Sequence, residues 1–488
     1  MNTIAAQFTR EDTWANVFLA VWGVLLLGPH VVAAGPYSGD ISELTLCAWV
    51  GGVPHSPGYP LWTRLAEFAV TLQHSSNPIH AIGRMGVVLA CLSALVTRRF
   101  LRDCGAGIWT ATAAAGLIFV VPMGIRAFSI PEVFALDLLL MCGMFAAFQR
   151  GQQTDTPAWT YFGAISAVLA IGHRPINVIL LLALGLGWHF NRNAKRGIAW
   201  GLASGVSLQG LLYWDLWTRI QHPNTAWVDE HAVATVTGFG RFILGLPFEA
   251  FFVWSPADTP IVSNPLVLGL QATALVGIGL IAPLLIRPKR LGWAIWIVFI
   301  WHLLFIAVFQ VPDSEPLFLP PLWLGIVCVG LSFQRIPSSF RRNAGTVFLV
   351  LVLLVSAINQ QGLRTIGIDA WQKELRDVLS AVPENTILLS DDWKSRTGLV
   401  AVRELDDIGK TVDVVRISLD GGDIQRLDEW FQGLVPLVLL EERSEIATVR
   451  PVRVHDGRLL PLLIAYGLIT EPAEAGTWAV TRPPTEAQ

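Results

Sequence analysis

Long apolar runs alternate with short polar connections through the first 360 residues of the chain. A helix needs about 20 mostly apolar residues to cross a bilayer. Eleven runs approach this length, with limits near residues 13–33, 82–97, 106–122, 132–148, 159–172, 176–190, 197–213, 261–285, 291–308, 317–333 and 344–360. We therefore expect a mainly α protein, a polytopic transmembrane bundle of about eleven spans. The first run exceeds a signal-peptide core in length, so we interpret it as a retained helix.

The composition agrees with this pattern. Of 488 residues, 53% are hydrophobic and only 15% are charged, as is typical of integral membrane proteins. The net charge of −3 offers no basic field for nucleic acid. Five cysteines are scattered without paired spacing, which indicates neither a disulfide framework nor a zinc site. We expect a protein of the plasma or inner membrane, surrounded by membrane lipids.

Basic residues lie in alternate connections between the apolar runs. Short cytoplasmic loops carry the excess of Lys and Arg. The residues concerned are Arg98, Arg99, Arg102, Arg150, Arg192, Lys195, Arg196, Arg287, Lys289, Arg290, Arg335, Arg341 and Arg342. They all fall on one side if the N-terminus is cytoplasmic, which places the loop of residues 35–80 outside the cytoplasm.

The composition changes after residue 361. Charges become frequent, and a helical pattern at 371–382 is followed by strand-like runs at 386–390 and 412–419, a helix at 423–434 and a strand at 435–441. This alternation predicts a small α/β domain over 362–488, after a membrane module over 1–361. By the span count it is extracytoplasmic, and we expect it to bind the acceptor or to cover the cleft.

Two further segments have an interfacial pattern. Residues 61–72 place apolar side chains at helical spacing with polar ones around the rest of the turn, which predicts a helix lying on the membrane surface. Residues 241–254 are short and interrupted by Pro247, so we expect an interfacial or re-entrant segment there.

Asp40 and Glu43 are the first candidates for chemistry. They lie just after the first predicted span, and ionisable groups at the edge of a bilayer often mark a site. Three residues apart, they share one face of a helix. The same spacing also fits a capping box, with Asp40 as N-cap and Glu43 reaching back to it. The two roles are compatible.

A histidine and a tight turn follow within 20 residues. His55 precedes the turn Pro57-Gly58-Tyr59-Pro60, whose composition indicates a fixed backbone. His55 is a candidate to orient a phosphate or carboxylate, and the alternative is a hydrogen bond within the turn. Tyr59 is the second candidate binding residue of this loop.

More candidates lie at the same predicted face. Glu132 opens the fourth span, where an acidic residue also favours the helix start. His173 and Arg174 pair a titratable ring with a permanent cation between the fifth and sixth spans, and Arg suits bidentate phosphate contact. Snorkelling to the interface is the alternative for this pair. Arg126 is a further cation with weaker support.

No metal site is assigned by the sequence. Asp229, Glu230 and His231 are adjacent, so they cannot all converge on one ion, and a solvated loop is the simpler interpretation. Phosphate-binding and hydrolase motifs of soluble enzymes are absent from the sequence.

Four runs of the sequence resemble a known family. The runs GDISEL and HSPGYPLW around Asp40 and His55, EVFALD at 132–137 and VPENTILLSDDW at 382–393 are similar to motifs of the protein O-mannosyltransferase-like membrane family, within the GT-C glycosyltransferase superfamily. Two departures are Ser56, where the family has Pro, and Asp137, where it usually has Asn. The resemblance is close in the first third of the chain and loose in the C-terminal part.

The resemblance implies a GT-C-like fold and an enzyme that uses a polyprenyl-phosphate sugar, with mannose as a guess from the family name. Asp40 would be the catalytic base and Glu43 its neighbour or second acid. Arg174, with Arg126 or His55, would meet the phosphate. The acceptor is a protein, lipid or glycan hydroxyl, and no cofactor is implied beyond an optional divalent cation held by Asp40 and Glu43.

A non-enzymatic polytopic protein remains the alternative, either a transporter of lipid-linked substrates or an envelope assembly scaffold. Transporters commonly place charged residues near the bilayer midplane between two related halves. In this sequence the ionisable residues gather toward one face and no internal repeat stands out, which favours an enzyme.

Overall fold

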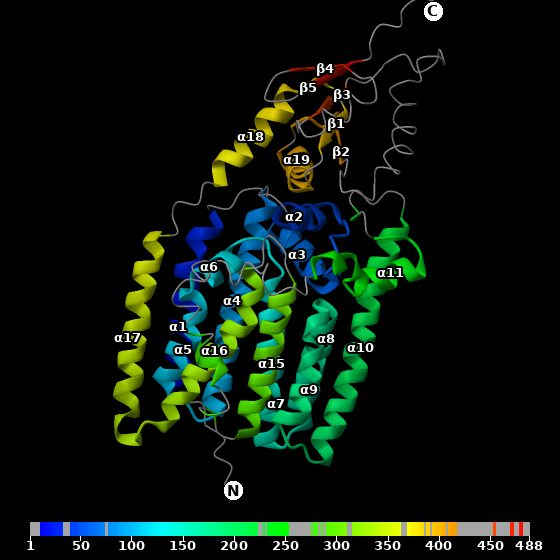
Figure 1. The fold of residues 1–488 in the computed structure, drawn as a ribbon. Coiled ribbons are helices and arrows are strands. Elements are labelled where there is room, and N and C mark those ends of the chain that lie inside the picture. Colours follow the sequence, from blue (N-terminus) through cyan, green and yellow to red (C-terminus); the bar gives the residue numbers. More distant parts are fainter. Residues whose placement is uncertain are drawn as a thin grey trace, which may run out of the picture. The chain divides into compact units, whose positions relative to one another are not determined.

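The computed structural model is built from helices, with a small sheet near the C-terminus (Figure 1). It describes residues 10–32, 40–73, 77–222, 228–229, 232–252, 275, 277–281, 284, 286, 289–309, 315–362, 368–384, 387–390, 393–406, 408–416, 452–454, 469–472 and 478–481. The chain divides into two compact units: residues 1–34 with 47–366, and residues 35–46 with 367–488.

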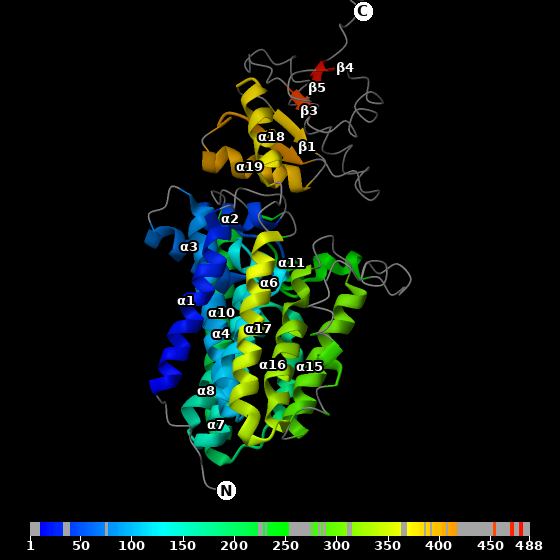
Figure 2. The same ribbon diagram turned by 90° about the vertical axis from the view of Figure 1, so that its left-hand side faces the viewer.

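The first unit is the helical bundle. Its elements are α1 (Arg10–Val32), the end of α2 (Asp40–Val50), α3 (Pro60–Gln73), α4 (Pro78–Asp103), α5 (Ile108–Val120), α6 (Pro122–Ser129), α7 (Phe134–Thr154), α8 (Pro157–His173), η1 (Pro175–Val178), α9 (Ile179–Gly187), α10 (Arg192–Gln221), α11 (Val236–Ile243), η2 (Leu246–Phe251), α15 (Lys289–Val308), η4 (Glu315–Phe318), α16 (Leu319–Ser332), η5 (Phe333–Arg335) and α17 (Ser338–Gly362). In Figure 2 the helices α1, α4, α16 and α17 run along roughly the same axis.

Ten of the eleven predicted segments coincide with helices of this unit; the segment 261–285 lies mostly outside the described residues. Among the described helices, six are long and apolar enough to cross a membrane, or seven if α5 and α6 form one span bent by 69°. The predicted helix at 61–72 is confirmed as α3. The number of spans stays a prediction.

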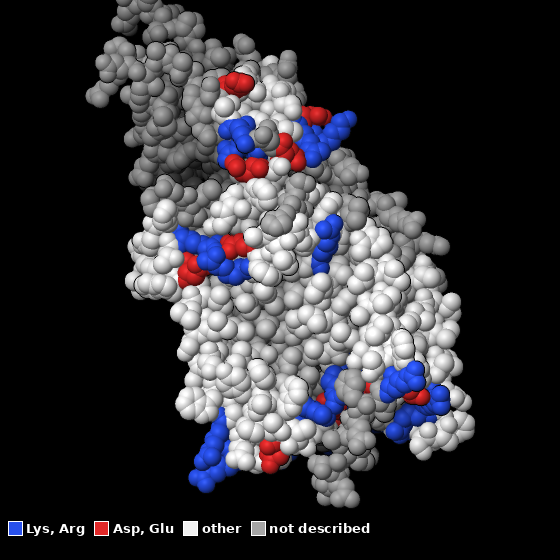
Figure 3. Space-filling model, turned by 180° about the vertical axis from the view of Figure 1, so that it is seen from behind, with Lys and Arg blue, Asp and Glu red and all other residues white. Residues whose placement is uncertain are grey.

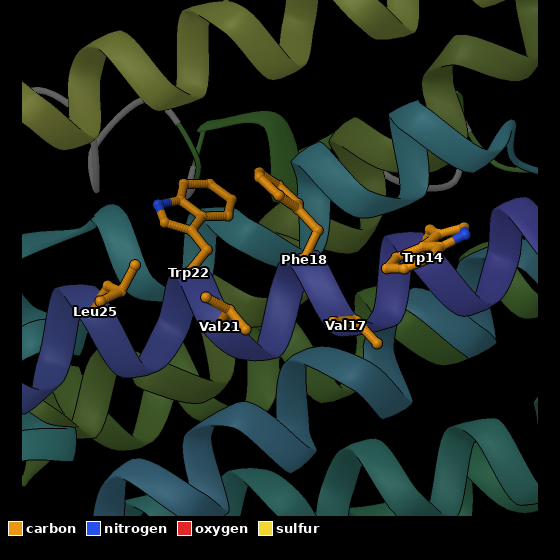
Figure 4. A pocket seen from close by; sticks show the side chains of 6 residues that line it. All are labelled: Trp14, Val17, Phe18, Val21, Trp22 and Leu25. Atoms are coloured by element: carbon orange, nitrogen blue, oxygen red, sulfur yellow. The ribbon is translucent and has the colours of Figure 1, made fainter.

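Charged side chains avoid the middle of the bundle. On the face shown in Figure 3, those of the helical unit gather toward the two ends of the helices, with a band of uncharged side chains between. Helix α1 contributes to this apolar surface: Trp14 is 61% and Leu25 68% exposed. In Figure 4, Phe18 and Trp22 rise next to each other from α1 and line an open apolar groove of about 340 Å³. A surface of this kind suits lipid chains rather than water.

Close helix packing depends on small residues. Gly197, Gly201 and Gly205 recur every four residues on α10 and face α8, where an added Cβ would collide with Pro157 O, Tyr161 O and Val168 respectively. Small residues at this spacing let two helix backbones approach in an apolar medium. Helices α8 and α10 therefore pack along each other in parallel. Their C-terminal residues, His173 and Gln221, lie toward the same end of the bundle. We call this the site end.

At the opposite end several arginines are paired with acidic side chains. Arg98 is buried and donates to Asp12 (2.7 Å), Asn16 (2.7 Å) and Thr112 (3.0 Å). Arg99 and Arg150 both contact Asp103, at 2.8 and 3.2 Å. Some of the arginines from which we predicted the membrane orientation therefore form ion pairs between helices. The orientation itself stays a prediction.

The second unit contains α18 (Ile368–Ala381), α19 (Trp393–Asp406) and five strands: β1 (Ile387–Ser390), β2 (Asp413–Arg416), β3 (Val452–Val454), β4 (Ile469–Pro472) and β5 (Trp478–Thr481). The sheet order is β2-β1-β3-β5-β4. β1 is parallel to β2 and β3, with Ile387 opposite Asp413 and Val452, and β5 is antiparallel to β3 and β4.

Helix α19 connects the parallel strands β1 and β2 and packs on them. It also packs against α18, where Arg376 donates to Asp406 at 2.7 Å. The predicted elements at 371–382, 386–390 and 412–419 have counterparts in α18, β1 and β2, whereas those at 423–441 lie outside the described residues. A separate domain beginning at 362, and its location, stay predictions.

Candidate active site

The loop of residues 51–59 at the site end is tied to distant parts of the bundle. Arg219 of α10 donates to the carbonyl of Gly52 at 3.2 Å. Val53 forms a parallel bridge with Val228 and accepts a hydrogen bond from the Asp229 amide at 3.0 Å. The Ser56 hydroxyl donates to the carbonyl of Phe242. These contacts fix the loop between α10 and α11, as its turn composition predicts.

Two consecutive residues of the loop have left-handed backbone angles, Gly58 with φ +83° and Tyr59 with φ +38°. Such angles cost little for glycine and about 1 kcal/mol or more for other residues. The Tyr59 conformation is held by Thr63, whose amide and hydroxyl both donate to the Tyr59 carbonyl, at 2.9 and 3.1 Å. Backbone strain at a buried aromatic residue favours a functional reason for its placement.

Replacing Gly58 by Ala is expected to destabilise the protein by about 2–4 kcal/mol, because the strained φ adds to an overpacked contact. An added Cβ would lie 2.5 Å from Leu216 and 3.0 Å from Phe242. Gly51→Ala is the matched control: its φ is +70° but nothing lies within 4 Å of an added Cβ. Thermal unfolding in one detergent measures both variants. Equal losses would show that backbone strain alone sets the requirement for Gly58.

Tyr59 joins two histidines that are 118 positions apart in the chain. Its hydroxyl lies 3.3 Å from His55 Nε2, and the two rings meet edge-on with centroids 5.3 Å apart. Its ring also contacts His173, with centroids 5.4 Å apart. All three side chains are at least nine-tenths buried. The predicted residues His55, Tyr59 and His173 are therefore brought together.

Arg174, next in the chain, belongs to a buried polar network. Its guanidinium lies 3.3 Å from Asp137 Oδ2 and 4.9 Å from the ring centroid of Phe134. Asn177 donates to Asp137 Oδ1 at 2.6 Å, and His302 Nε2 lies 3.3 Å from Asn177 Oδ1. Asp137, Asn177 and His302 are each at most 2% exposed. The network joins α7, α8, η1 and α15 and holds Arg174 beside His173.

Glu132 and Arg126 take different positions. Glu132 is half-buried and lies two residues before α7 begins, and its carbonyl accepts a hydrogen bond from Trp62 Nε1 at 3.0 Å. That bond links the EVFALD segment to the first loop. Arg126 is exposed on α6. The structure thus places the Glu132 backbone against α3, the helix that directly follows the loop of Tyr59, and Arg126 on a surface.

Asp40 and Glu43 lie in the second unit, on the first turn of α2. Glu43 is fully buried and Asp40 is partly exposed. Helix α2 begins at Asp40 and continues to Val50, directly before the loop of residues 51–59. The two carboxylates share a helix that leads into this loop; their catalytic roles stay predictions.

An ion-pair network on α3 and α10 is absent from the sequence-based expectations. Glu67 contacts both Arg64 (2.7 Å) and Arg219 (3.0 Å), and Asp215 contacts the same two arginines. The local signals of this network are two pairs of opposite charge about one helical turn apart, Arg64 with Glu67 and Asp215 with Arg219. Since Arg219 also holds Gly52, this network supports the backbone of the candidate loop.

No group of three or more His, Cys, Asp or Glu side chains that could hold a metal ion occurs within the described residues. Of the sequence Asp229-Glu230-His231, only Asp229 is described. Its amide supports the loop through Val53.

Comparison with known proteins supports the resemblance. Residues 40–197 match the family described as the protein O-mannosyl-transferase TMEM260 N-terminal domain. No curated protein matches the chain. Among solved structures, ArnT from Cupriavidus metallidurans bound to undecaprenyl phosphate is similar, with a TM-score of 0.60, 12% identity, and coverage of 97% of this chain and 98% of ArnT. Its apo state gives a TM-score of 0.59 at 14% identity, over 96% and 98%.

Arabinofuranosyltransferase AftD from Mycobacteria gives a TM-score of 0.50 at 14% identity, covering 93% of this chain and 39% of AftD. At these identities the structural matches concern the fold, and the sequence match concerns the first part of the chain. The chain thus has a fold similar to that of ArnT, and its residues 40–197 are similar to the N-terminal domain of a protein O-mannosyl-transferase family.

Proposed function

We propose that the chain is an integral membrane glycosyltransferase that moves a sugar from a polyprenyl-phosphate-linked donor to an acceptor hydroxyl at the extracytoplasmic face. One observation carries the proposal: the matched segment 40–197 contains all eight candidate residues. Five of them, His55, Tyr59, Glu132, His173 and Arg174, lie near one another at one end of the bundle.

The proposed reaction is a single displacement at the anomeric carbon. Asp40 accepts the proton of the acceptor hydroxyl as its oxygen forms a bond to that carbon. The bond between the anomeric carbon and the phosphate oxygen breaks, and the lipid phosphate leaves with the electron pair. Arg174 stabilises the charge on this phosphate, which a fixed cation does without reorganisation. One displacement inverts the anomeric configuration.

The finer features of the donor and topology belong to the same proposal. A polyprenyl-phosphate donor is supported by the undecaprenyl phosphate bound to ArnT, and mannose by the name of the matched family. The acceptor is a protein, lipid or glycan. We place the N-terminus in the cytoplasm, about eleven spans in the membrane and an α/β domain over 362–488 outside it. A divalent cation between Asp40 and Glu43 is an optional addition.

Sugar transfer by the purified protein in lipid nanodiscs tests the proposal. Radiolabelled decaprenyl-phosphate mannose and related donors are offered with peptide, lipid and glycan acceptors, and the product's anomeric configuration is read by NMR. We expect transfer from at least one donor, with inversion. Binding of donors without any turnover across the panel would favour the transporter or scaffold. Donor movement across liposome membranes would then separate these two.

A further inference from the structure

The imidazole of His173 has one nitrogen engaged and one that is not. Its Nε2 lies 3.0 Å from the carbonyl oxygen of Val133, and the side chain is 1% exposed. Its Nδ1 is equally buried and has no hydrogen-bond partner among the described residues. Buried polar atoms of native proteins nearly always have a partner, so this atom requires an explanation.

The contact with Val133 settles which nitrogen carries the hydrogen. A carbonyl oxygen only accepts, so Nε2 is the donor. In a neutral ring Nδ1 is then an acceptor with its lone pair unused. A second proton on Nδ1 would create a buried charge without a hydrogen-bond partner, which is costly. His173 therefore presents a fixed acceptor rather than a donor.

The surroundings of His173 connect this acceptor with the proposed reaction. Tyr59 packs against the ring, with centroids 5.4 Å apart, and comes from the first loop. Val133 follows Glu132 in the EVFALD segment. Arg174 is the next residue, held by Asp137 at 3.3 Å. Three segments that the sequence singled out thus meet at one imidazole.

A lone pair repels an anion and attracts a hydroxyl hydrogen. The donor phosphate is therefore excluded as the partner of Nδ1, and the phosphate is assigned to Arg174. The transferred sugar is joined directly to that phosphate, so its hydroxyl groups lie within a few ångströms of it. We propose that His173 Nδ1 accepts a hydrogen bond from one hydroxyl of the transferred sugar and so selects the donor. This inference rests on the proposed function.

Two substitutions separate the two nitrogens. In His173→Gln, the amide nitrogen takes the place of Nε2 and keeps the donor to Val133, but the acceptor is lost. In His173→Asn, the amide oxygen takes the place of Nδ1, and the anchor to Val133 is lost. His189→Gln, at the opposite end where His189 Nδ1 lies 3.1 Å from Arg290, controls for the general effect of replacing His by Gln.

The measurement is kcat/KM for the donor that the wild type uses, and for its monodeoxyfluoro analogues, which keep the size of each hydroxyl but cannot donate. With the natural donor, we expect His173→Gln to lower kcat/KM by about 10- to 100-fold at unchanged thermal stability. One of the analogues lacks the hydroxyl that His173 binds. For that analogue, and for no other, wild type and His173→Gln should have equal kcat/KM. His173→Asn should retain discrimination between the natural donor and that analogue.

The outcomes are distinguishable. If the wild type turns over no donor, the proposed function fails and this inference fails with it. If the wild type is active and His173→Gln loses the same factor with every analogue, the imidazole only supports the fold and the inference is overturned. Unchanged kcat/KM in His173→Gln would also overturn it, and would assign the unused lone pair to a structural water.

Discussion

Asp40→Asn is expected to lower sugar transfer by about 10²- to 10⁴-fold while leaving donor binding and thermal stability near those of the wild type. The amide cannot take a proton from the acceptor hydroxyl at neutral pH. Asn supports the start of a helix as well as Asp does, so we expect α2 still to begin at position 40. An activity loss without a stability loss would therefore separate catalysis from capping, the alternative that the sequence left open.

The same experiment has two matched controls. Asp155→Asn changes an acid at the C-cap of α7, where φ is +55° and Asn is also tolerated. It should leave transfer unchanged. Glu43→Gln replaces the fully buried neighbour without changing its size. An effect of Glu43→Gln as large as that of Asp40→Asn would indicate a shared role for the two acids. Asp40→Asn retaining a tenth or more of the wild-type rate would exclude Asp40 as the base.

Much of the helical bundle was predictable from hydropathy because an apolar run of spanning length has few alternatives in a membrane. Ten predicted segments have counterpart helices for this reason. The predicted segment 106–122 ends where α5 meets α6 at a bend of 69°. The helix α6 itself was not predicted, because its eight residues, with Arg126 among them, are too short to register as an apolar run.

The candidate site was predictable residue by residue but not as an arrangement. His55, Tyr59, His173 and Arg174 stood out as polar groups at the ends of apolar runs. Their mutual contacts depend on helix packing, which a single sequence does not encode at separations of over 100 residues. Arg219 illustrates the limit: it contacts Gly52 across 167 positions, and no local pattern signals the contact.

Asn177 and His302 were missed for a different reason. His302 lies in the apolar run of α15, and a titratable residue within such a run is itself a signal. The sequence pointed instead to the polar clusters at the ends of the spans. Asp137 was noted as a departure from the family's Asn, without a named partner. The structure shows its partners to be Arg174 and Asn177, so the departure adds a negative charge beside a largely buried arginine.

Arg174→Gln is expected to destabilise the protein by about 3–5 kcal/mol, since removing one partner of a buried pair leaves the other charge uncompensated. Asp137 is 2% exposed, and among the described residues the hydrogen bond from Asn177 is the one its carboxylate keeps in this variant. The measurement is the apparent melting temperature in one detergent, with donor affinity determined on the same samples. Arg192 is an exposed arginine at the start of α10, and Arg192→Gln serves as the control. This variant should change the free energy of unfolding by less than about 0.5 kcal/mol.

The double variant Arg174→Gln/Asp137→Asn separates the effect of Arg174 on stability from its effect on donor binding. It replaces the ion pair by two neutral amides that can still hydrogen-bond, so we expect it to recover at least half of the lost stability. Donor affinity should not recover, because the cation proposed to meet the phosphate is still missing. Recovery of both would show that Arg174 only neutralises Asp137, and the phosphate would then have to be met by another cation, with Arg126 as the next candidate.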